Sequence, residues 1–306
     1  MKISVLLPYY NEEQTITKSL VALLNQTKVL DEVIFIDSGS TDTTSKIIDA
    51  WISDNMMTAS FKNIYSGKMS PSSSINKGID HANGDIIGYI DCGLNIPLNW
   101  YENLSNYIVK DIAEIVSCSI YTDGVGLTDK SLISQTYGYK NKRACLTGSI
   151  INKKVFDQIG VFIPDVRAGY DVDFINRIKK SNIKRTVIYD YPLKYYSTNY
   201  AKTYLIAFKK VFNYSLSALK AEGDHKPLLY FFFSLLLFII KIEILILFYI
   251  IIRGIAIPVI KSNYKRLSSE PYIFFLLPLS GLVIDSARVF GYIYAMFNFL
   301  RSLIPK

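Results

Sequence analysis

Residues 85–100 read Asp-Ile-Ile-Gly-Tyr-Ile-Asp-Cys-Gly-Leu-Asn-Ile-Pro-Leu-Asn-Trp, and this stretch decides the fold. An apolar run ends at one carboxylate, Asp91, and then breaks into a turn rich in Gly, Asn and Pro. A carboxylate at the carboxyl end of a buried strand lies where open α/β sheets bind ligands, and it can hold a divalent cation against a phosphate. The stretch therefore predicts a buried strand that presents Asp91 to a ligand.

Two earlier segments repeat this pattern of an apolar strand followed by a polar turn. Residues 3–7 lead into Pro8-Tyr9-Tyr10-Asn11-Glu12-Glu13, and residues 33–36 lead into Asp37-Ser38-Gly39-Ser40-Thr41-Asp42. Apolar residues at helical spacing follow each turn, namely Ile16, Leu20, Leu23 and Leu24, and then Ile47, Ile48 and Trp51. This alternation predicts right-handed crossovers and a mostly parallel sheet.

The rest of the first 200 residues predicts fewer elements. We expect a Ser/Pro-rich loop over residues 67–74 and a helix over 75–82. Beyond residue 100, strands are expected at 115–121 and 185–188, and helices at 154–159 and 170–180. Gly124-Val125-Gly126 lacks the third glycine and the setting of a dinucleotide fingerprint, which argues against NAD.

The composition favours one sizeable α/β domain with a membrane-associated appendage. The chain has 306 residues, of which 50% are hydrophobic and 14% aromatic. The apolar stretches 228–252 and 272–300 each reach the ~20 residues that span a bilayer. The first strand begins directly after Met1 and Lys2, so we expect residues 1–225 to stay in the cytosol. Three cysteines without paired spacing fit a reduced, cytosolic domain.

The positive charge is concentrated near the apolar stretches. The net charge is +8, and from residue 228 onward eight Lys and Arg residues stand against three acidic ones, so this tail carries +5. Anionic lipid is therefore the expected partner, and no nucleic acid is expected. A single span over 228–252 would place the basic residues 253–266 outside the cell, against the rule that basic residues stay on the cytoplasmic side. We therefore prefer a hairpin that turns near Lys241-Ile242-Glu243 and returns these residues to the cytoplasm. Residues 272–300 are then a further span or an in-plane helix in which Asp285 and Arg288 need polar surroundings.

The segment from 200 to 220 joins the two parts. Its apolar residues recur at helical spacing, at Leu205, Phe208, Phe212, Leu216 and Leu219, and four lysines flank them. Core packing is one explanation of that stripe. The lysines and nearby tyrosines favour an amphipathic helix at the membrane interface.

These motifs together resemble family 2 glycosyltransferases, which are inverting enzymes of the GT-A fold. The resemblance rests on motifs in the family's order, over about residues 1 to 215. They are Ser4 to Glu12, Ile36 to Asp42, Asn76-Lys77-Gly78 with Ala82 to Asp85, Asp91, Thr147-Gly148-Ser149, and Gly169 to Phe174 with Arg177. The implied fold is a Rossmann-like mixed sheet.

The resemblance implies roles for particular residues. A nucleotide-diphospho-sugar would be bound by Pro8, Tyr9, Glu12, Asp37, Ser40, Asn76 and Asp91. Asp91 would also hold Mg²⁺ or Mn²⁺ against the departing diphosphate. The family's Asp-x-Asp reads Asp91-Cys92-Gly93 here, so one carboxylate is missing. Asp171 matches the general base, and Asp173 is the second candidate. Turn or helix-cap roles remain an alternative for these acids.

The sequence thus predicts a GT-A catalytic domain at 1–200, an interfacial helix at 201–227 and membrane-embedded helices at 228–306. The expected activity is sugar transfer from a nucleotide donor to a lipid-linked glycan or polysaccharide precursor of the cell envelope, at the cytoplasmic face of the membrane. A polyprenyl-phosphate monoglycosyltransferase is one alternative. A catalytically silent nucleotide-sugar-binding membrane subunit is another, because Gly93 replaces the second carboxylate.

Overall fold

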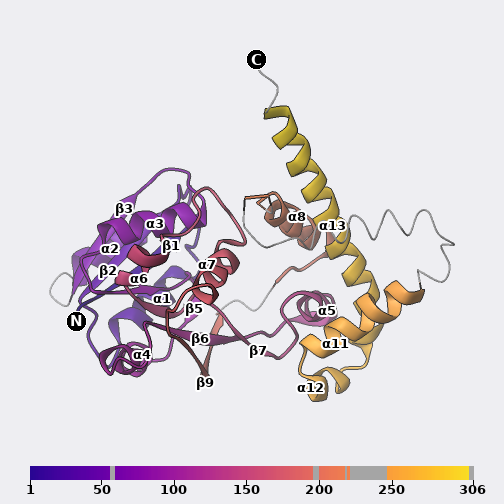
Figure 1. Cartoon of the computed structure of the whole chain (residues 1–306), viewed down its shortest axis with the longest axis horizontal. Helices are drawn as coiled ribbons and strands as arrows, with labels where there is room; N and C mark the ends of the chain where they lie inside the picture. Colours follow the sequence, from indigo (N-terminus) through magenta and orange to yellow (C-terminus); the bar gives the residue numbers. More distant parts are fainter. Residues whose placement is uncertain (56–58, 196–199, 218, 221–246, 303–306) are drawn as a thin grey trace. The chain divides into compact units, whose positions relative to one another are not determined.

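The computed structural model describes residues 1–55, 59–195, 200–217, 219–220 and 247–302 (Figure 1). These residues form two compact units. Residues 1–120 and 144–197 make the first unit, and residues 121–143 and 198–306 make the second. The second unit therefore combines an internal segment of the chain with its C-terminal part.

The first unit is built on a sheet with the strand order β3-β2-β1-β4-β8-β6-β9-β5, and β7 pairs with β6 off this path. The strands are β1 (Ile3–Tyr9), β2 (Glu32–Asp37), β3 (Ser60–Tyr65), β4 (Ile86–Tyr89), β5 (Leu94–Asn95), β6 (Ile115–Tyr121), β7 (Lys142–Ala144), β8 (Ser149–Asn152) and β9 (Arg185–Tyr195).

The sheet is parallel in its N-terminal half and mixed beyond it. β1 pairs in parallel with β2 and β4, and β2 pairs in parallel with β3. β8 is antiparallel to both β4 and β6, while β6 and β9 are parallel. The predicted strands at 3–7, 33–36 and 115–121 are confirmed. The mostly parallel sheet expected from the alternation is correct only for β1 to β4, because the four-residue β8 is too short to show a periodicity.

Helices pack on both faces of this sheet (Figure 1). One core includes apolar residues of α1 (Ile16–Leu24), α2 (Thr44–Asn55) and α4 (Trp100–Val109). The other includes residues of α3 (Pro71–His81), α6 (Lys154–Ile159) and α7 (Tyr170–Lys179). β1 serves both cores because its side chains alternate: Val5 and Leu7 belong to the first core, and Leu6 to the second. Each of these three side chains is fully buried.

Helix α3 begins earlier than the sequence predicts. Residues 71–74 were expected in a loop, but Ser70 caps the helix by accepting a hydrogen bond from Ser73 N at 3.2 Å, and Pro71 occupies the first turn. Serine at the cap and proline just inside are the residues that start a helix, so this Ser/Pro-rich stretch is a helix start.

The second unit consists mainly of helices. They are α5 (Gly126–Thr136), α8 (Tyr204–Ser215), the π-helix η1 (Tyr249–Ala256), α11 (Ile257–Lys261), α12 (Tyr264–Ser268) and α13 (Tyr272–Ser302). α13 has 31 residues and is the helix, among those described, that is long and apolar enough to cross a membrane. It matches the apolar stretch predicted at 272–300. The turn expected near residues 241–243 lies outside the described residues.

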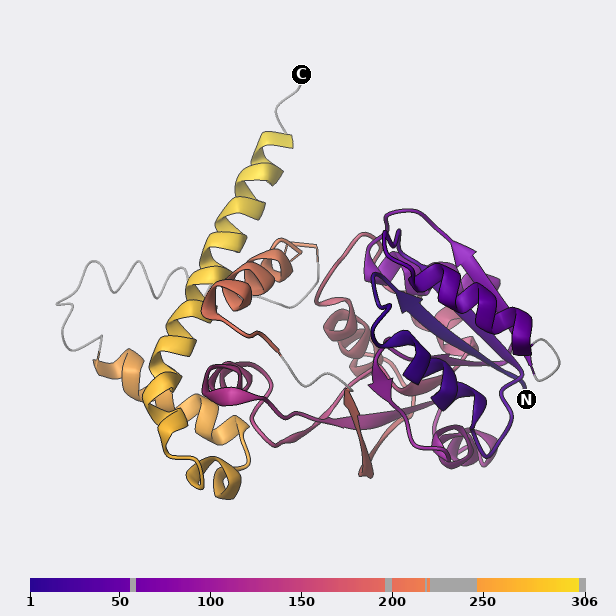
Figure 2. The ribbon, with the colours of Figure 1, turned by 180° about the vertical axis from the view of Figure 1, so that it is seen from behind.

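α8 packs beside α13 (Figure 2). Its buried face is centred on Ala207, Val211 and Ser215, and Phe208 packs against Phe290 of α13 with ring centroids 6.3 Å apart. Leu205, which was expected to share the apolar stripe, is 64% exposed. Part of the stripe therefore packs within the unit, and Leu205 lies on the outer side.

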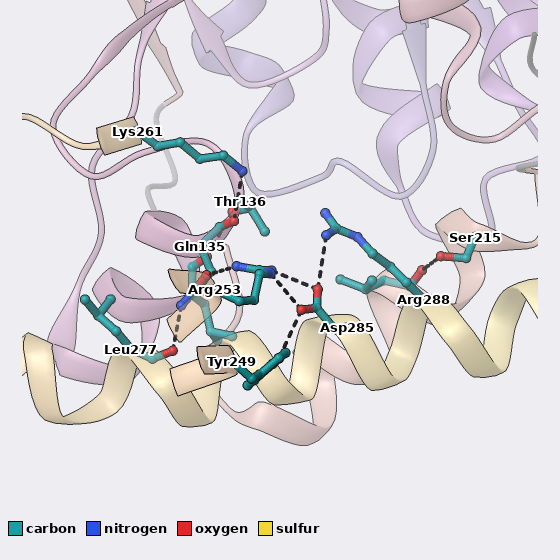
Figure 3. A network of polar contacts seen from close by, with 11 residues as sticks. Gln135, Thr136, Ser215, Tyr249, Arg253, Lys261, Leu277, Asp285 and Arg288 are labelled. Carbon is teal, nitrogen blue, oxygen red and sulfur yellow. Dashed lines mark hydrogen bonds and ion pairs between the residues drawn. The ribbon is translucent and has the colours of Figure 1, made fainter. Parts of the chain in front are cut away.

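The charges inside these apolar helices are paired, as Figure 3 shows. Asp285 of α13 accepts hydrogen bonds from Arg253 of η1 at 2.8 Å, from Arg288 at 3.4 Å and from the Tyr249 hydroxyl at 3.0 Å. Gln135 of α5 completes the network: its amide donates to the carbonyl oxygens of Gly254 and Leu277, and it accepts from Arg253. Asp285 and Arg288 thus have the polar surroundings that the sequence required.

Candidate active site

The turn after β2 is held by Asp37. Its carboxylate accepts hydrogen bonds from the backbone N–H of Gly39 at 3.1 Å and of Ser40 at 2.8 Å, and from the Ser45 hydroxyl at 2.8 Å. Gly39 has φ +90°, and a Cβ there would lie 2.9 Å from the Lys68 nitrogen, so glycine is required. Asp37 is buried and shapes this turn, and its contact with a nucleotide stays a prediction.

The turn after β1 is tied to the turn after β2. Asn11, at φ +54°, accepts from Thr41 N at 2.8 Å, and its own N–H donates to the Ser40 hydroxyl at 3.1 Å. Pro8 lies opposite Ile36 in the ladder. The two turns therefore form one polar rim at the carboxyl ends of β1 and β2.

Tyr9 points into the core and does not lie on that rim. Its side chain is 2% exposed, and its hydroxyl donates to Asn63 at 2.9 Å and contacts Ser45 at 3.0 Å. Burial raises the pKa of Tyr9 to about 12, against the opposing effect of these hydrogen bonds. The ring contributes packing here, and a direct donor contact by Tyr9 stays a prediction.

Asp91 is the centre of a network of hydroxyl groups. Its two carboxylate oxygens accept from Tyr89 at 2.5 Å and from Tyr195 at 2.6 Å, and its backbone N–H donates to the Thr147 hydroxyl at 2.9 Å. The Tyr89 hydroxyl also contacts the Tyr170 hydroxyl at 3.1 Å. Burial raises the pKa of Tyr89 well above its ordinary value, and the negative charge of Asp91 adds to this. Tyr89 therefore stays protonated and can donate.

Glu12 is a second carboxylate near Asp91. Burial raises the pKa of Glu12, and repulsion from Asp42 and Asp91 adds to it, while a hydrogen bond from Thr15 lowers it. Glu12 and Asp91 are thus close enough for their charges to repel, and two nearby carboxylates suit a cation or a hydroxyl-bearing ligand.

Gly93, at the position of the missing carboxylate, forms the turn after Asp91. It has φ +78°, and its N–H donates to Ser19 at 3.0 Å. A left-handed turn favours glycine. Beside it, burial raises the pKa of the Cys92 thiol to about 12, so Cys92 is a neutral thiol at this site.

Asn76 holds two segments of the chain together. Its amide donates to the Phe162 carbonyl at 2.7 Å and accepts from Phe162 N at 3.0 Å. Both ends of the side chain are thus used to fix the loop before α7, and its predicted contact with the donor remains a prediction.

The two candidate bases differ in their surroundings. Asp173 is 2% exposed and forms an ion pair with Arg177 at 2.8 Å, and Arg177 also donates to the carbonyls of Ile159, Gly160 and Val161. Asp171 lies in the first turn of α7, half-buried, directly after Tyr170. Asp173 therefore helps to hold the loop between α6 and α7, and the role of Asp171 as the base stays a prediction.

Sequence reasoning missed the roles of Tyr89, Tyr195 and Thr147 around Asp91. Tyr195 lies 104 positions from Asp91, so no local spacing could indicate their contact. Thr147 stood within a motif of the family resemblance, but its partner was not evident from the sequence.

The side chains around Asp91 are compatible with a cation that takes most of its ligands from a substrate. Among the described residues, no group of three or more His, Cys, Asp or Glu side chains is placed to hold a metal ion. Mg²⁺ is commonly bound by one or two carboxylates together with substrate phosphates. Each Asp91 oxygen accepts one phenolic hydrogen and retains a further lone pair, so Asp91 fits that arrangement.

Two curated relatives align with part of the chain. The undecaprenyl-phosphate 4-deoxy-4-formamido-L-arabinose transferase of Proteus mirabilis is 34% identical over 101 residues, which are 31% of this chain and 30% of that protein. The cholesterol galactosyltransferase of Borreliella burgdorferi is 32% identical over 136 residues, 43% of this chain and 37% of that protein. The chain thus spans less than half the length of these relatives.

Solved structures share the fold. The mannosyltransferase PcManGT from Pyrobaculum calidifontis, in complex with GDP-Man and Mn²⁺, has a TM-score of 0.60 at 14% identity, over 97% of this chain and 87% of that one. S. aureus TarS 1-349 in complex with UDP-GlcNAc has a TM-score of 0.50 at 16% identity, over 100% of this chain and 93% of that one. Residues 4–178, more than half of the chain, match the family model of glycosyl transferase family 2. With its mixed α/β sheet of the GT-A type, the chain belongs to glycosyl transferase family 2.

Proposed function

We propose that this enzyme transfers a sugar, with inversion, from a nucleotide-diphospho-sugar to a lipid-linked acceptor at the membrane. One observation carries the proposal: the hydroxyl network of Asp91 reaches Tyr170, the residue next to Asp171. The carboxylate that faces the leaving group and the one that activates the acceptor would then lie on the same side of the sugar-binding region. Asp91 follows β4 and Asp171 begins α7, so different elements hold them.

In the proposed reaction Asp171 accepts the proton of the acceptor hydroxyl as that oxygen attacks the anomeric carbon. Asp171 is half-buried in the first turn of α7, and a carboxylate positioned beside an acceptor hydroxyl can act as its general base. Asp173 is less suited, because Arg177 stabilises its charged form. The polar rim at the carboxyl ends of β1 and β2 would bind the nucleotide through Asn11, Asp37 and Ser40. Pro8 and Glu12 would lie beside it.

Asp91 would hold Mg²⁺ or Mn²⁺, which supplies positive charge to the departing diphosphate. Tyr89 and Tyr195 orient the Asp91 carboxylate by donating to its two oxygens. A carboxylate fixed in this way does not need to reorganise when the leaving group develops its charge.

A lipid acceptor is supported by the second unit and by the relatives. α13 is long and apolar enough to span a bilayer, and the names of both relatives include a lipid. We propose that the first unit faces the cytoplasm, because basic residues around Lys261, Lys265 and Arg266 favour that side. The amphipathic helix α8 would lie near the interface, with Leu205 and Ile206 exposed.

The test uses the purified full-length protein in detergent with a panel of UDP- and GDP-linked sugars and a bacterial membrane lipid extract. The expected result is nucleotide release that requires both a donor and the extract, with labelled sugar recovered in the lipid phase. Donor binding without release would identify a silent binding subunit and overturn the proposal. Mild hydrolysis of the labelled lipid then separates an extended lipid-linked glycan from a single sugar on a polyprenyl phosphate.

A further inference from the structure

A groove of about 390 Å³ lies between α4 and β9 in the first unit. Its walls include Asn103, Asn106 and Tyr107 of α4, and Asp190 and Tyr191 of β9. The groove is open to solvent, because Asn106 and Asp190 are exposed and Tyr191 is 57% exposed. Small-molecule sites have volumes of about 300–1,000 Å³, so the groove is large enough for a ligand. None of its residues belongs to the nucleotide rim, to the Asp91 network or to the candidate bases.

An irregular part of β9 builds one wall of the groove. Between its pairings with Cys118 and Ile120 of β6, β9 runs from residue 188 to residue 193, so it advances by five residues while β6 advances by two. The extra residues disrupt the ladder, and β9 projects from the sheet (Figure 2). Asp190 and Tyr191 lie in this part of the strand. Bulges re-aim side chains in this way and are common next to active sites.

Helix α4 builds the other wall. Asn103, Asn106 and Tyr107 line the groove together with Lys110, the residue after the helix. Residues three, four and seven positions apart lie on the same face of a helix, so these side chains are neighbours. Tyr107 is partly buried and packs against the first core, as does Ile188 on the β9 side. The groove therefore has a fixed apolar floor with polar side chains around it.

The fold does not use these polar side chains. Within the described part of the chain, the side chains of Asn103, Asn106 and Asp190 form no hydrogen bond. Lys110 and Asp190 likewise form no ion pair with any described residue, and their opposite charges cancel in the lining. An amide both donates and accepts hydrogen bonds, and a carboxylate accepts them. The groove thus offers donors and acceptors to a neutral, polar ligand.

A sugar ring fits this combination of side chains. The C–H face of a sugar ring is apolar, and each of its hydroxyl groups can donate and accept a hydrogen bond. Tyr107 and Tyr191 supply rigid aromatic rings that can cover the apolar face. A lipid tail would leave the amide groups buried without partners, and a phosphate would be repelled by the carboxylate of Asp190. The lining therefore favours a carbohydrate over both.

The same strand joins the groove to Asp91. Tyr191 lies four residues before Tyr195, whose hydroxyl donates to Asp91 at 2.6 Å. Four residues of fully extended chain span at most about 14 Å. A short oligosaccharide can therefore occupy the groove with one end and reach the surroundings of Asp91 with the other.

We propose that the groove between α4 and β9 is a second carbohydrate-binding site. It holds a sugar residue of the acceptor glycan, away from the residue that receives the new sugar. Tyr107 and Tyr191 pack against the ring of this sugar, and Asn103, Asn106 and Asp190 bind its hydroxyl groups. The inference rests on the proposed function, and it adds a site that selects acceptors with several sugars over acceptors with none.

Isothermal titration calorimetry tests the site directly. The full-length protein is used in lauryldimethylamine oxide, a detergent without a sugar headgroup, with UDP and GDP present to occupy the nucleotide site. The probes are maltotetraose, mannotetraose and chitotetraose, and sorbitol is a hydroxyl-rich control that has no ring. At least one tetrasaccharide is expected to bind, and sorbitol is not. If no tetrasaccharide bound up to its solubility limit, or if sorbitol bound equally well, the inference would be overturned.

Three variants locate the bound sugar. Tyr191→Ala should weaken the binding of that tetrasaccharide by at least about tenfold, the loss of one aromatic contact together with its buried area. Tyr191→Phe keeps the ring and should retain most of the affinity. Tyr189→Ala removes the neighbouring exposed tyrosine, which does not line the groove, and should bind as the wild type does. Equal affinities of Tyr191→Ala and the wild type would place the sugar elsewhere and overturn the inference.

Kinetics connect the site with the acceptor. Tyr191→Ala is expected to raise the KM for the lipid extract by at least about tenfold and to leave kcat unchanged, because contacts in the groove bind ground state and transition state alike. Donor hydrolysis without extract and the unfolding midpoint should equal those of the wild type, since Tyr191 is exposed. An unchanged KM in a variant that has lost tetrasaccharide binding would separate the groove from the acceptor and overturn the assignment.

The two proposals can fail separately. Absence of donor turnover in the wild type would be a failure of the proposed function, and the tetrasaccharide titration would still decide whether the groove binds a sugar. Normal turnover of the wild type, with no tetrasaccharide binding and with an unchanged KM in Tyr191→Ala, would be a failure of the groove alone.

Discussion

Tyr195 donates its phenolic hydroxyl to Asp91 at 2.6 Å and thereby joins the end of β9 to the end of β4. Tyr89 donates to the other carboxylate oxygen at 2.5 Å. Asp91 is thus held by one tyrosine from its own strand and one from a distant strand. The orientation of this carboxylate depends on the assembled sheet, and the first prediction follows from it.

Asp91→Ala should reduce turnover by at least about 10²-fold, the scale of losing one main electrostatic stabiliser of a developing charge. The measurement is steady-state nucleotide release at several Mg²⁺ and Mn²⁺ concentrations. Asp80→Ala, at an exposed position of α3, is the matched control and should behave as the wild type. Near-normal turnover of folded Asp91→Ala, with unchanged metal dependence, would contradict the role of Asp91.

Asp171→Asn should retain donor binding and lose transfer by about 10² to 10⁴-fold, because the amide has no basicity. Calorimetry of donor binding and single-turnover transfer separate the two effects. Asp157→Asn changes another first-turn acid, in α6, and serves as the control. Lost donor binding in Asp171→Asn would place this residue in the donor pocket.

Asp173→Asn should act on stability much more than on transfer. It removes the charged partner of Arg177, which holds three carbonyl groups before α7. We expect the free energy of unfolding to fall by about 1–3 kcal/mol, the cost of weakening a buried hydrogen bond between charged groups. Thermal unfolding checks this. A stable Asp173→Asn variant that loses transfer would make Asp173 the base.

Glu32 should make the stability of the first unit depend on pH. Burial alone would raise its pKa, but hydrogen bonds from Asn83, Lys62 and Ser4 outweigh burial and lower the pKa of Glu32 to about 2. A lowered pKa in the folded state means that the contribution is complete above the ordinary value of 4.5 and is lost as the pH falls toward 2. At neutral pH the contribution is about 3 kcal/mol.

The measurement is the unfolding midpoint of wild type and Glu32→Gln between neutral pH and about pH 2. The variant should be less stable at neutral pH, and the difference should shrink as the solution is acidified. A difference that does not change with pH would show that Glu32 acts through packing and not through its charge.

Asp285→Asn should destabilise the second unit strongly, because it leaves Arg253 buried without a counter-charge. Breaking a buried ion pair on one side costs about 3–5 kcal/mol, whereas replacing both partners by apolar residues is often neutral. The double variant Arg253→Met with Asp285→Leu should therefore recover most of the stability in detergent. If the single and double variants unfolded at the same temperature, the pair would not be the source of the stability.

The sequence by itself determined the N-terminal half of the sheet and the family. Residues 3–7, 33–36 and 85–91 show strong apolar runs followed by polar turns, and these patterns are local, so they can be seen without a structure. The same holds for Asp91 at the end of its strand and for the apolar stretch at 272–300.

Only the tertiary structure decided how the candidate site is arranged. β8 is too short to carry a periodic signal. The partners of Asp91 include Thr147 and Tyr195 of β9, while Tyr170 of α7 contacts the Tyr89 hydroxyl. The burial of Tyr9 and Asp37 and the pairing of Asp173 with Arg177 also depend on what surrounds each side chain. Hydrogen bonds and desolvation act over a few ångströms in space, whereas a sequence pattern records only neighbours along the chain.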